Sequence, residues 1–178
     1  MRYAGMVCMV LAAVGGGFYA GWFLHMQLEI LITFRQMFSY LKGRILYGND
    51  PLPDALAEIG NQFYKEKRDG TYVPGGFFLQ VARRMELEKS RNFSEIWKEE
   101  VRRIPADVLP SKTDRKNLAD LGDHLGYADR SMQERTLNFY LEQTEESIAA
   151  KKRELEEKTK LYRSLGLAAG LFLVVVLI

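Results

Sequence analysis

Residues 3–24 read YAGMVCMVLAAVGGGFYAGWFL, which is 22 positions without a charged side chain. A helix needs about 20 apolar residues to cross the hydrocarbon core of a bilayer. The three consecutive glycines from Gly15 would weaken a helix in water. Small residues are frequent in membrane helices, however, where they let a neighbouring helix approach closely. The stretch therefore predicts an N-terminal transmembrane helix over residues 1–24.

A cleaved secretory signal is the competing interpretation of this end of the chain. Arg2 would be its charged region and residues 3–13 its apolar region. No small-x-small cleavage site follows, and the helical pattern continues past Leu24, so the transmembrane interpretation is favoured.

The C-terminal end is also apolar. Residues 165–178 carry no charge, and 14 helical residues at 1.5 Å each extend about 21 Å. With Leu161 and Tyr162 added, and Arg163 reaching toward the head groups, this helix spans or nearly spans a bilayer. A buried core helix is the alternative, but the closing Val-Val-Val-Leu-Ile offers no polar face. We expect a second transmembrane helix over residues 165–178.

Charge is concentrated between the two ends. The 178 residues include 25 Lys and Arg and 23 Asp and Glu, a formal charge of +2, so no whole-chain field argues for nucleic acid. The length allows one domain plus accessory segments. Cys8 is the one cysteine, which excludes an internal disulfide or a cysteine metal cluster.

The distribution of Lys and Arg predicts the orientation in the membrane. Loops rich in these residues stay in the cytoplasm. On the side of the membrane away from residues 25–164, the one basic residue is Arg2. We therefore expect both termini outside and residues 25–164 in the cytoplasm. The basic residues next to the spans on that side are Arg35, Lys42, Arg44, Lys151, Lys152, Arg153, Lys158, Lys160 and Arg163.

The segment over residues 25–164 reads as about six helices, because apolar residues recur at steps of three and four. The first continues the N-terminal span without a break. Later starts are expected at Pro51 or Pro53, at Pro74, at Asn92 or Ser94, and at Pro110 or Ser111. The expected inward-facing residues are Leu28, Leu31, Phe34, Phe38, Leu41 and Ile45; Leu52, Leu56, Ile59 and Phe63; Phe77, Phe78, Val81, Met85 and Leu87; Ile96, Trp97 and Val101; and Leu118, Leu121 and Leu125.

The last helix is expected to run from Asp129 or Ser131 into the second span, since neither Gly nor Pro occurs before Gly166. Apolar residues repeat along it at seven-residue steps, but the alternate positions are polar. This pattern indicates a one-sided contact stripe, with the first helix as its partner. The apolar positions are Leu141, Ile148, Leu155 and Tyr162, and the polar ones are Thr144, Lys151 and Lys158.

Asp120, Asp123, His124 and Asp129 form the one polar cluster that suggests chemistry, as metal ligands or a general base. Asp120 and His124 share a helix face, but Asp123 is offset and no metalloprotease-like spacing occurs. The favoured interpretation is a solvated face, with Asp129 as an N-cap. Gly75 and Gly76 lack the Lys, Ser or Thr of a phosphate loop and indicate a helix-entry turn.

Trp97 lies on a helix that alternates charged and apolar residues. We expect it to anchor the core, in preference to a partner-binding hot spot.

Several stretches together resemble the stage III sporulation protein AB family. They are LYGNDPLPDAL at residues 46–56, FSEIW at 93–97, DLGDHLG at 120–126 and KLYRSLG at 160–166 just before the terminal span. The resemblance covers nearly the whole chain. It implies a cytoplasmic domain of about six helices similar to the type II secretion F domain, over residues 25–164.

The resemblance implies a non-enzymatic role in endospore formation, with no catalytic, cofactor-binding or metal-binding residues. The family is expected in the mother-cell membrane around the forespore, as a platform component of a channel between the two cells. The expected partners are the bilayer, the ATPase stage III sporulation protein AA and other membrane proteins of the same operon. No nucleic acid or small-molecule substrate is expected.

Three alternatives stay open at this point. One is a platform component of a type II secretion or pilus machine, which normally carries duplicated domains. Another is a two-span signal transducer, which needs an output domain beyond the second span, where this chain ends. The last is an enzyme, which requires Asp123 and His124 to lie in a pocket with a perturbed pKa.

Overall fold

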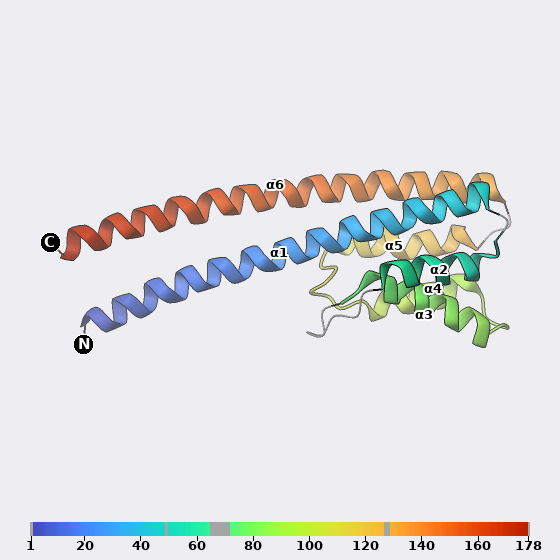
Figure 1. Ribbon diagram of the computed structural model, residues 1–178, viewed down its shortest axis with the longest axis horizontal. Helices are drawn as coiled ribbons and strands as arrows, with labels where there is room; N and C mark the ends of the chain where they lie inside the picture. The colour runs from blue at the N-terminus through green and yellow to red at the C-terminus, as the bar shows by residue number, and fades with distance from the viewer. Residues whose placement is uncertain (1, 49, 65–71, 127–128, 178) are drawn as a thin grey trace. The chain divides into compact units, whose positions relative to one another are not determined.

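The computed structural model describes residues 2–48, 50–64, 72–126 and 129–177, with side chains described over 22–161 of these and at Ser164. These residues form six α-helices and no strand, which confirms the all-α prediction (Figure 1). The helices are α1 (Arg2–Tyr47), α2 (Leu52–Phe63), α3 (Pro74–Leu87), α4 (Phe93–Arg103), α5 (Lys112–Leu125) and α6 (Arg130–Leu177).

The chain divides into two compact units. One contains Met1–Leu28 and Ala149–Ile178, the terminal parts of α1 and α6. The other, Glu29–Ile148, contains the rest of these two helices together with α2 to α5 and is called the helical domain below.

Both long helices are unbroken over their described lengths, 46 residues for α1 and 48 for α6. Where side chains are described, we find no helix with the length and apolar character needed to cross a membrane. Residues 1–21 and 165–178 lie outside that part, and they contain nearly all of the spans expected over 1–24 and 165–178.

Aromatic side chains from four helices form the centre of the helical domain. Phe38 of α1 is fully buried. Its ring centroid lies 5.2 Å from that of Phe78 in α3, 6.0 Å from Trp97 in α4 and 4.6 Å from Tyr140 in α6. Edge-to-face pairs of this kind add to the area that aromatic rings bury. Phe38 therefore ties α1 to three other helices of the domain.

Short-range signals set the helix boundaries where the sequence predicted them. Pro74 stands in the first turn of α3, where its missing N–H leaves no bond unmade. The side chains of Asn92, Ser111 and Asp129 accept hydrogen bonds from the first-turn amides of α4, α5 and α6 at 3.0–3.1 Å. Each cap satisfies an amide that has no partner within its helix.

Most predicted inward-facing residues are buried, but Leu87 is not, and the stripe predicted on the last helix is confirmed in part. Leu87 at the end of α3 is 72% exposed, because its position falls off the apolar face. Along α6 the predicted stripe is confirmed at Ile148, which is buried, whereas Leu141 and Leu155 are partly exposed and Tyr162 lies outside the described side chains. The other described residues that this helix buries are Leu137, Tyr140 and Thr144. Thr144 is tolerated there because its hydroxyl donates to the Tyr140 carbonyl at 2.8 Å. The predicted partner is correct, since α6 packs on α1 through Phe38 and Tyr140.

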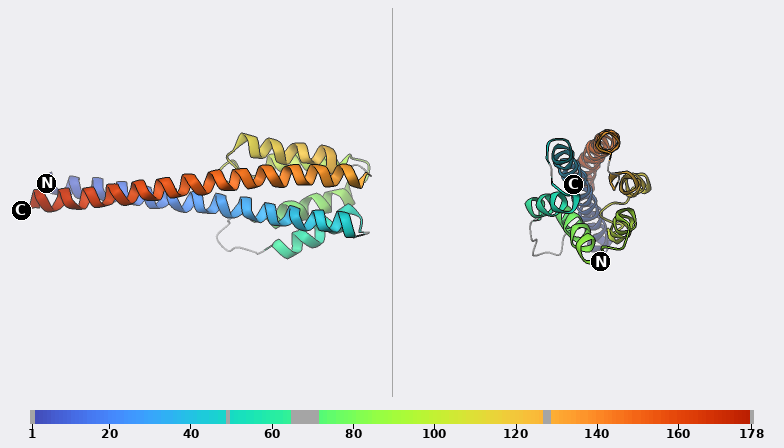
Figure 2. Two further views of the ribbon diagram at one scale, coloured as in Figure 1. Left: turned by 90° about the horizontal axis from the view of Figure 1, so that it is seen from above. Right: turned by 90° about the vertical axis from the view of Figure 1, so that its right-hand side faces the viewer.

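Close helix contacts depend on two glycines. A Cβ atom at Gly122 would lie 2.3 Å from Cδ1 of Trp97, so α4 and α5 approach closely where Gly122 stands. A Cβ atom at Gly75 would lie 2.5 Å from the Tyr64 amide nitrogen and 2.6 Å from the Gly60 carbonyl oxygen. Figure 2 shows how the helices of the domain are arranged, with α2 beside α1 and α5 beside α6.

Candidate interaction surfaces and polar networks

The structure separates the polar residues singled out in the sequence. Asp120 and His124 line a groove of about 430 Å³ between α5 and α6. Asp123 turns to α4, where Lys98 Nζ lies 2.6 Å from its carboxylate and the Ser94 hydroxyl donates to it at 2.5 Å. These two donors, Lys98 first, lower the pKa of Asp123.

Asp129 caps α6, as predicted, and stands apart from this groove's lining. Among the described residues, no three His, Cys, Asp or Glu side chains gather in a way that would hold a metal ion. The groove is instead bordered by the apolar side chains of Met132 and Phe139, which are 41% and 61% exposed. The arrangement fits a contact surface better than a reaction centre.

Trp97 is the core anchor that the sequence predicted. Its side chain is fully buried, and its indole N–H donates to the Leu118 carbonyl at 2.7 Å. Its ring also packs against Phe77 and Phe93, with centroid distances of 4.8 and 5.4 Å. It thus fixes α5 against α3 and α4 and is not available to a partner.

An ionic network joins α3 to α4. Arg84 is 12% exposed and donates to three carboxylates: Glu88 at 2.7 Å, Glu99 at 2.7 Å and Glu100 at 2.9 Å. Glu100 is buried and also accepts from Arg103 at 2.6 Å. Arg91 adds bonds to Glu88, Glu95 and Glu99 at 3.0, 3.4 and 2.6 Å.

The network has a predicted signature in the pH dependence of stability. Hydrogen bonds from Arg91 and Arg84 lower the pKa of Glu99 from its usual 4.5 to about 2. The unfolded chain therefore binds this proton more readily than the folded one. The stabilisation is fully present above about pH 4.5 and is lost as pH falls toward 2.

We expect the melting temperature of the full chain to fall across that window. Glu99→Gln should flatten the decline, because it removes the linkage between this carboxylate and folding. Arg91→Gln should flatten it in part, because Arg84 still donates to Glu99. Circular dichroism melts between pH 5 and 2 measure it. A decline as steep in Glu99→Gln as in the parent chain would contradict this assignment.

Arg115 holds the connection between α4 and α5, a role that sequence reasoning missed. Its guanidinium donates to the carbonyls of Val101 at 3.0 Å, Ile104 at 2.9 Å, Pro105 at 3.1 Å and Leu109 at 3.0 Å. Several of these carbonyls are at the end of α4, where helix carbonyls lack partners within the helix. No local sequence signal marks a residue that bonds so many backbone groups.

A second groove, of about 610 Å³, lies between α1 and α2. Its lining includes Tyr40, Gly43 and Tyr47 of α1, and these tyrosines are 53% and 89% exposed. Arg44 crosses its edge to pair with Glu58 of α2. Tyr and Arg are enriched in protein interfaces, so this groove is the stronger candidate contact surface.

The polar groups of the domain are otherwise satisfied internally. Within the described residues, every buried side-chain nitrogen or oxygen has a hydrogen-bond partner. Buried polar groups with partners stabilise and specify a fold. The features left to act on other molecules are therefore surface ones.

Comparison with known proteins identifies the family. The sequence profile of a family described as Stage III sporulation protein AB matches residues 2–178. The chain belongs to this family. The resemblance drawn from residues 46–56 and 160–166 is therefore confirmed, and the chain is a member of a sporulation protein family.

Two members of the stage III sporulation protein AB family illustrate the relationship. Stage III sporulation protein AB of Bacillus subtilis (strain 168) is 24% identical over 177 residues, which is 99% of each chain. A solved structure of Stage III sporulation protein AB (SpoIIIAB) superimposes with a TM-score of 0.62 at 20% identity, covering 74% of this chain and 97% of that one. At this identity the likeness shows the shared helical fold.

Proposed function

We propose that this chain is a non-enzymatic platform component of the membrane apparatus that connects the mother cell to the forespore. In this proposal it couples a cytoplasmic ATPase of the secretion type, stage III sporulation protein AA, to the membrane complex. The observation that carries the proposal is the length of α1 and α6, which continue from the helical domain into the apolar ends of the sequence.

The packing of the domain supports a coupling role. Phe38 of α1 contacts α3, α4 and α6, so a displacement of the small helices is transmitted to both long ones. Close-packed protein interiors have low compressibility and transmit strain. The residues outside the core, including the two grooves, supply the surfaces for an ATPase and for neighbouring membrane proteins.

Membrane topology is the first experiment. In a Cys8→Ser background, single cysteines replace Lys89, an exposed residue of the domain, or Arg2. When the chain is expressed in non-sporulating cells, a membrane-impermeant maleimide should label Arg2→Cys in intact cells and Lys89→Cys after permeabilisation. Labelling of Lys89→Cys in intact cells would contradict the cytoplasmic placement.

Recruitment of the ATPase is the second experiment. The full chain in nanodiscs should retain stage III sporulation protein AA at micromolar concentration, and empty nanodiscs should not. A Gly75→Ala variant, in which α2 and α3 cannot pack as they do here, keeps both ends of the chain and serves as the matched control. Absence of any complex with the parent chain would remove the coupling role.

A further inference from the structure

Among the described residues, no neighbouring group explains why position 43 of α1 is a glycine. A Cβ atom at Gly60, Gly75 or Gly122 would collide with a neighbouring helix, so packing demands those glycines. A Cβ atom at Gly43 would meet no atom of the described residues within 4 Å. Glycine inside a helix costs roughly 0.5–1 kcal/mol relative to alanine. The open space at Gly43 would therefore admit the close approach of a helix from another molecule.

Gly43 belongs to a stripe along the outer face of α1. Ser39, Gly43 and Tyr47 are four residues apart and so lie in one row on the helix. Ser39 and Tyr47 are exposed, and Tyr40 borders the same row. Small residues at a four-residue spacing let two helices approach closely, with larger side chains packing at the sides.

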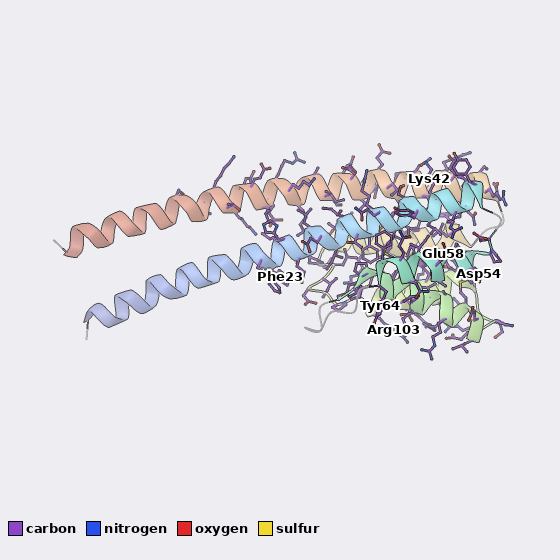
Figure 3. The ribbon with its side chains drawn as sticks, in the orientation of Figure 1. Phe23, Lys42, Asp54, Glu58, Tyr64 and Arg103 are labelled. Carbon is purple, nitrogen blue, oxygen red and sulfur yellow. The ribbon has the colours of Figure 1, made fainter. Side chains whose placement is uncertain are left out.

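Charged side chains lie on both sides of this stripe. Arg44 marks the side next to α2, because it pairs with Glu58 there. Arg35 marks the side next to α6, because it pairs with Glu145. Lys42 lies on this second side at a helical step of about 100° per residue. On the first side Arg44 already pairs with Asp50 and Glu58, so the exposed Asp54 of α2 supplies the negative charge there (Figure 3).

We propose that this stripe is the contact between two copies of the chain, arranged as a parallel twofold dimer that crosses at Gly43. A twofold axis places the side of one copy that adjoins α2 against the side of the other that adjoins α6. Lys42 of each copy then faces Asp54 of the other copy. Tyr40 and Tyr47 pack along the crossing, and the groove between α1 and α2 receives the second copy.

The parallel sense follows from the proposed function and rests on it. If both copies insert their ends in one membrane, their α1 helices must run in the same direction. The chemical fit of the stripe to a second copy does not depend on the ATPase, so failure of ATPase recruitment would leave the dimer measurable by itself.

Gly43→Ala and Gly43→Leu separate association from folding. The space at Gly43 is open, so alanine should raise the melting temperature by about 2–4 °C through helix propensity. The same substitutions should weaken dimerisation about tenfold or more, which corresponds to 1.4 kcal/mol. Sedimentation equilibrium of the full chain in detergent measures association. Gln80→Leu, which adds comparable bulk on the exposed face of α3, should leave it unchanged.

Charge exchange tests the pairing. Lys42→Glu and Asp54→Lys should each weaken dimerisation about tenfold, because each places like charges across the twofold axis. The double variant should recover most of the loss. Recovery of dimerisation in the double variant would be specific to this pairing. If each substitution acted by damaging the fold, the two losses would add and would not cancel.

Cross-linking tests the direction. In a Cys8→Ser background, Gly43→Cys should form a disulfide with itself on mild oxidation, and so should Ser39→Cys. Disulfides need Cα atoms roughly 4.4–6.8 Å apart, which a parallel crossing provides at both positions. Gln80→Cys should stay uncross-linked.

Three results would overturn the proposal. The parent chain could be monomeric at micromolar concentration, the Gly43 variants could dimerise as tightly as the parent, or Ser39→Cys could cross-link with Tyr47→Cys but not with itself. Loss of ATPase recruitment in Gly43→Leu, with dimerisation unchanged, would assign the stripe to the ATPase instead.

Discussion

Gly75→Ala is expected to lower the free energy of unfolding of the helical domain by about 3 kcal/mol, the upper part of the range for overpacking. The added Cβ atom would lie 2.5 Å from the Tyr64 amide nitrogen and 2.6 Å from the Gly60 carbonyl oxygen. Both atoms are backbone, so no side-chain rotation relieves the collision. The first turn of α3 must then move away from the end of α2.

The neighbouring glycine is the matched control. A Cβ atom at Gly76 would lie 3.6 Å from the Tyr64 ring, an ordinary contact. Gly76→Ala should therefore be neutral, or stabilise by up to about 1 kcal/mol through helix propensity. Urea denaturation of both variants, followed by circular dichroism, gives the comparison. Equal effects of the two substitutions would show that helix entry, and not the approach of α2, accounts for Gly75.

These glycines illustrate what sequence reasoning can and cannot reach. Pro74 and the two glycines after it predicted a helix start, because that signal acts over a few residues. The reason for Gly75 depends on Tyr64 and Gly60, which come from another helix. The same limit applies to Gly43. The open space beside it depends on how the other helices pack and cannot be read from the residues near it in sequence.

The long helices show a second limit. Apolar residues at three- and four-residue steps located the inner face of α1 correctly, including Phe34 and Phe38, because nearly all of that face is apolar. In α6 the buried positions include Tyr140 and Thr144, whose polar groups hide the pattern. A heptad count through Leu141 therefore selected a row that is partly exposed. A threonine whose hydroxyl bonds to a carbonyl of its own helix can be buried or exposed, and the packing of the neighbouring helices decides which.

The polar cluster around His124 shows why the sequence overstates chemistry. Asp120 and Asp123 are neighbours in the chain, but the helix turns them to different sides, one to the α5–α6 groove and one to Lys98. Titratable groups that are close in sequence lie close together in a helix only if they share a helix face. The network that does gather charge, around Arg84, draws on residues from two helices. Its pairs between residues three or four apart, such as Arg84 with Glu88 and Arg103 with Glu100, can be read from the sequence, whereas the bonds of Arg84 to Glu99 and Glu100 cannot.

Arg84→Leu is expected to be the most damaging change in that network, at about 2–3 kcal/mol. Glu100 is 5% exposed, and without Arg84 its charge would depend on Arg103, which is 64% exposed. Removing one partner of a buried pair is costly because the remaining charge stays buried without adequate compensation. We place the loss below the usual 3–5 kcal/mol, because Glu88 and Glu99 are about one-third exposed and can be hydrated.

Two controls separate the buried charge from the count of ion pairs. Arg91→Leu also removes bonds to three carboxylates, but none of them is Glu100, so its effect should be a small fraction of that of Arg84→Leu. In the double variant Arg84→Leu/Glu100→Leu the buried charge is gone, and much of the stability should return. Urea denaturation of the parent chain, Arg84→Leu, Glu100→Leu and the double variant gives a double-mutant cycle, and Arg91→Leu is measured beside it. A double variant no more stable than Arg84→Leu would mean that the arginine acts by packing its alkyl chain, and that the buried carboxylate is not what requires it.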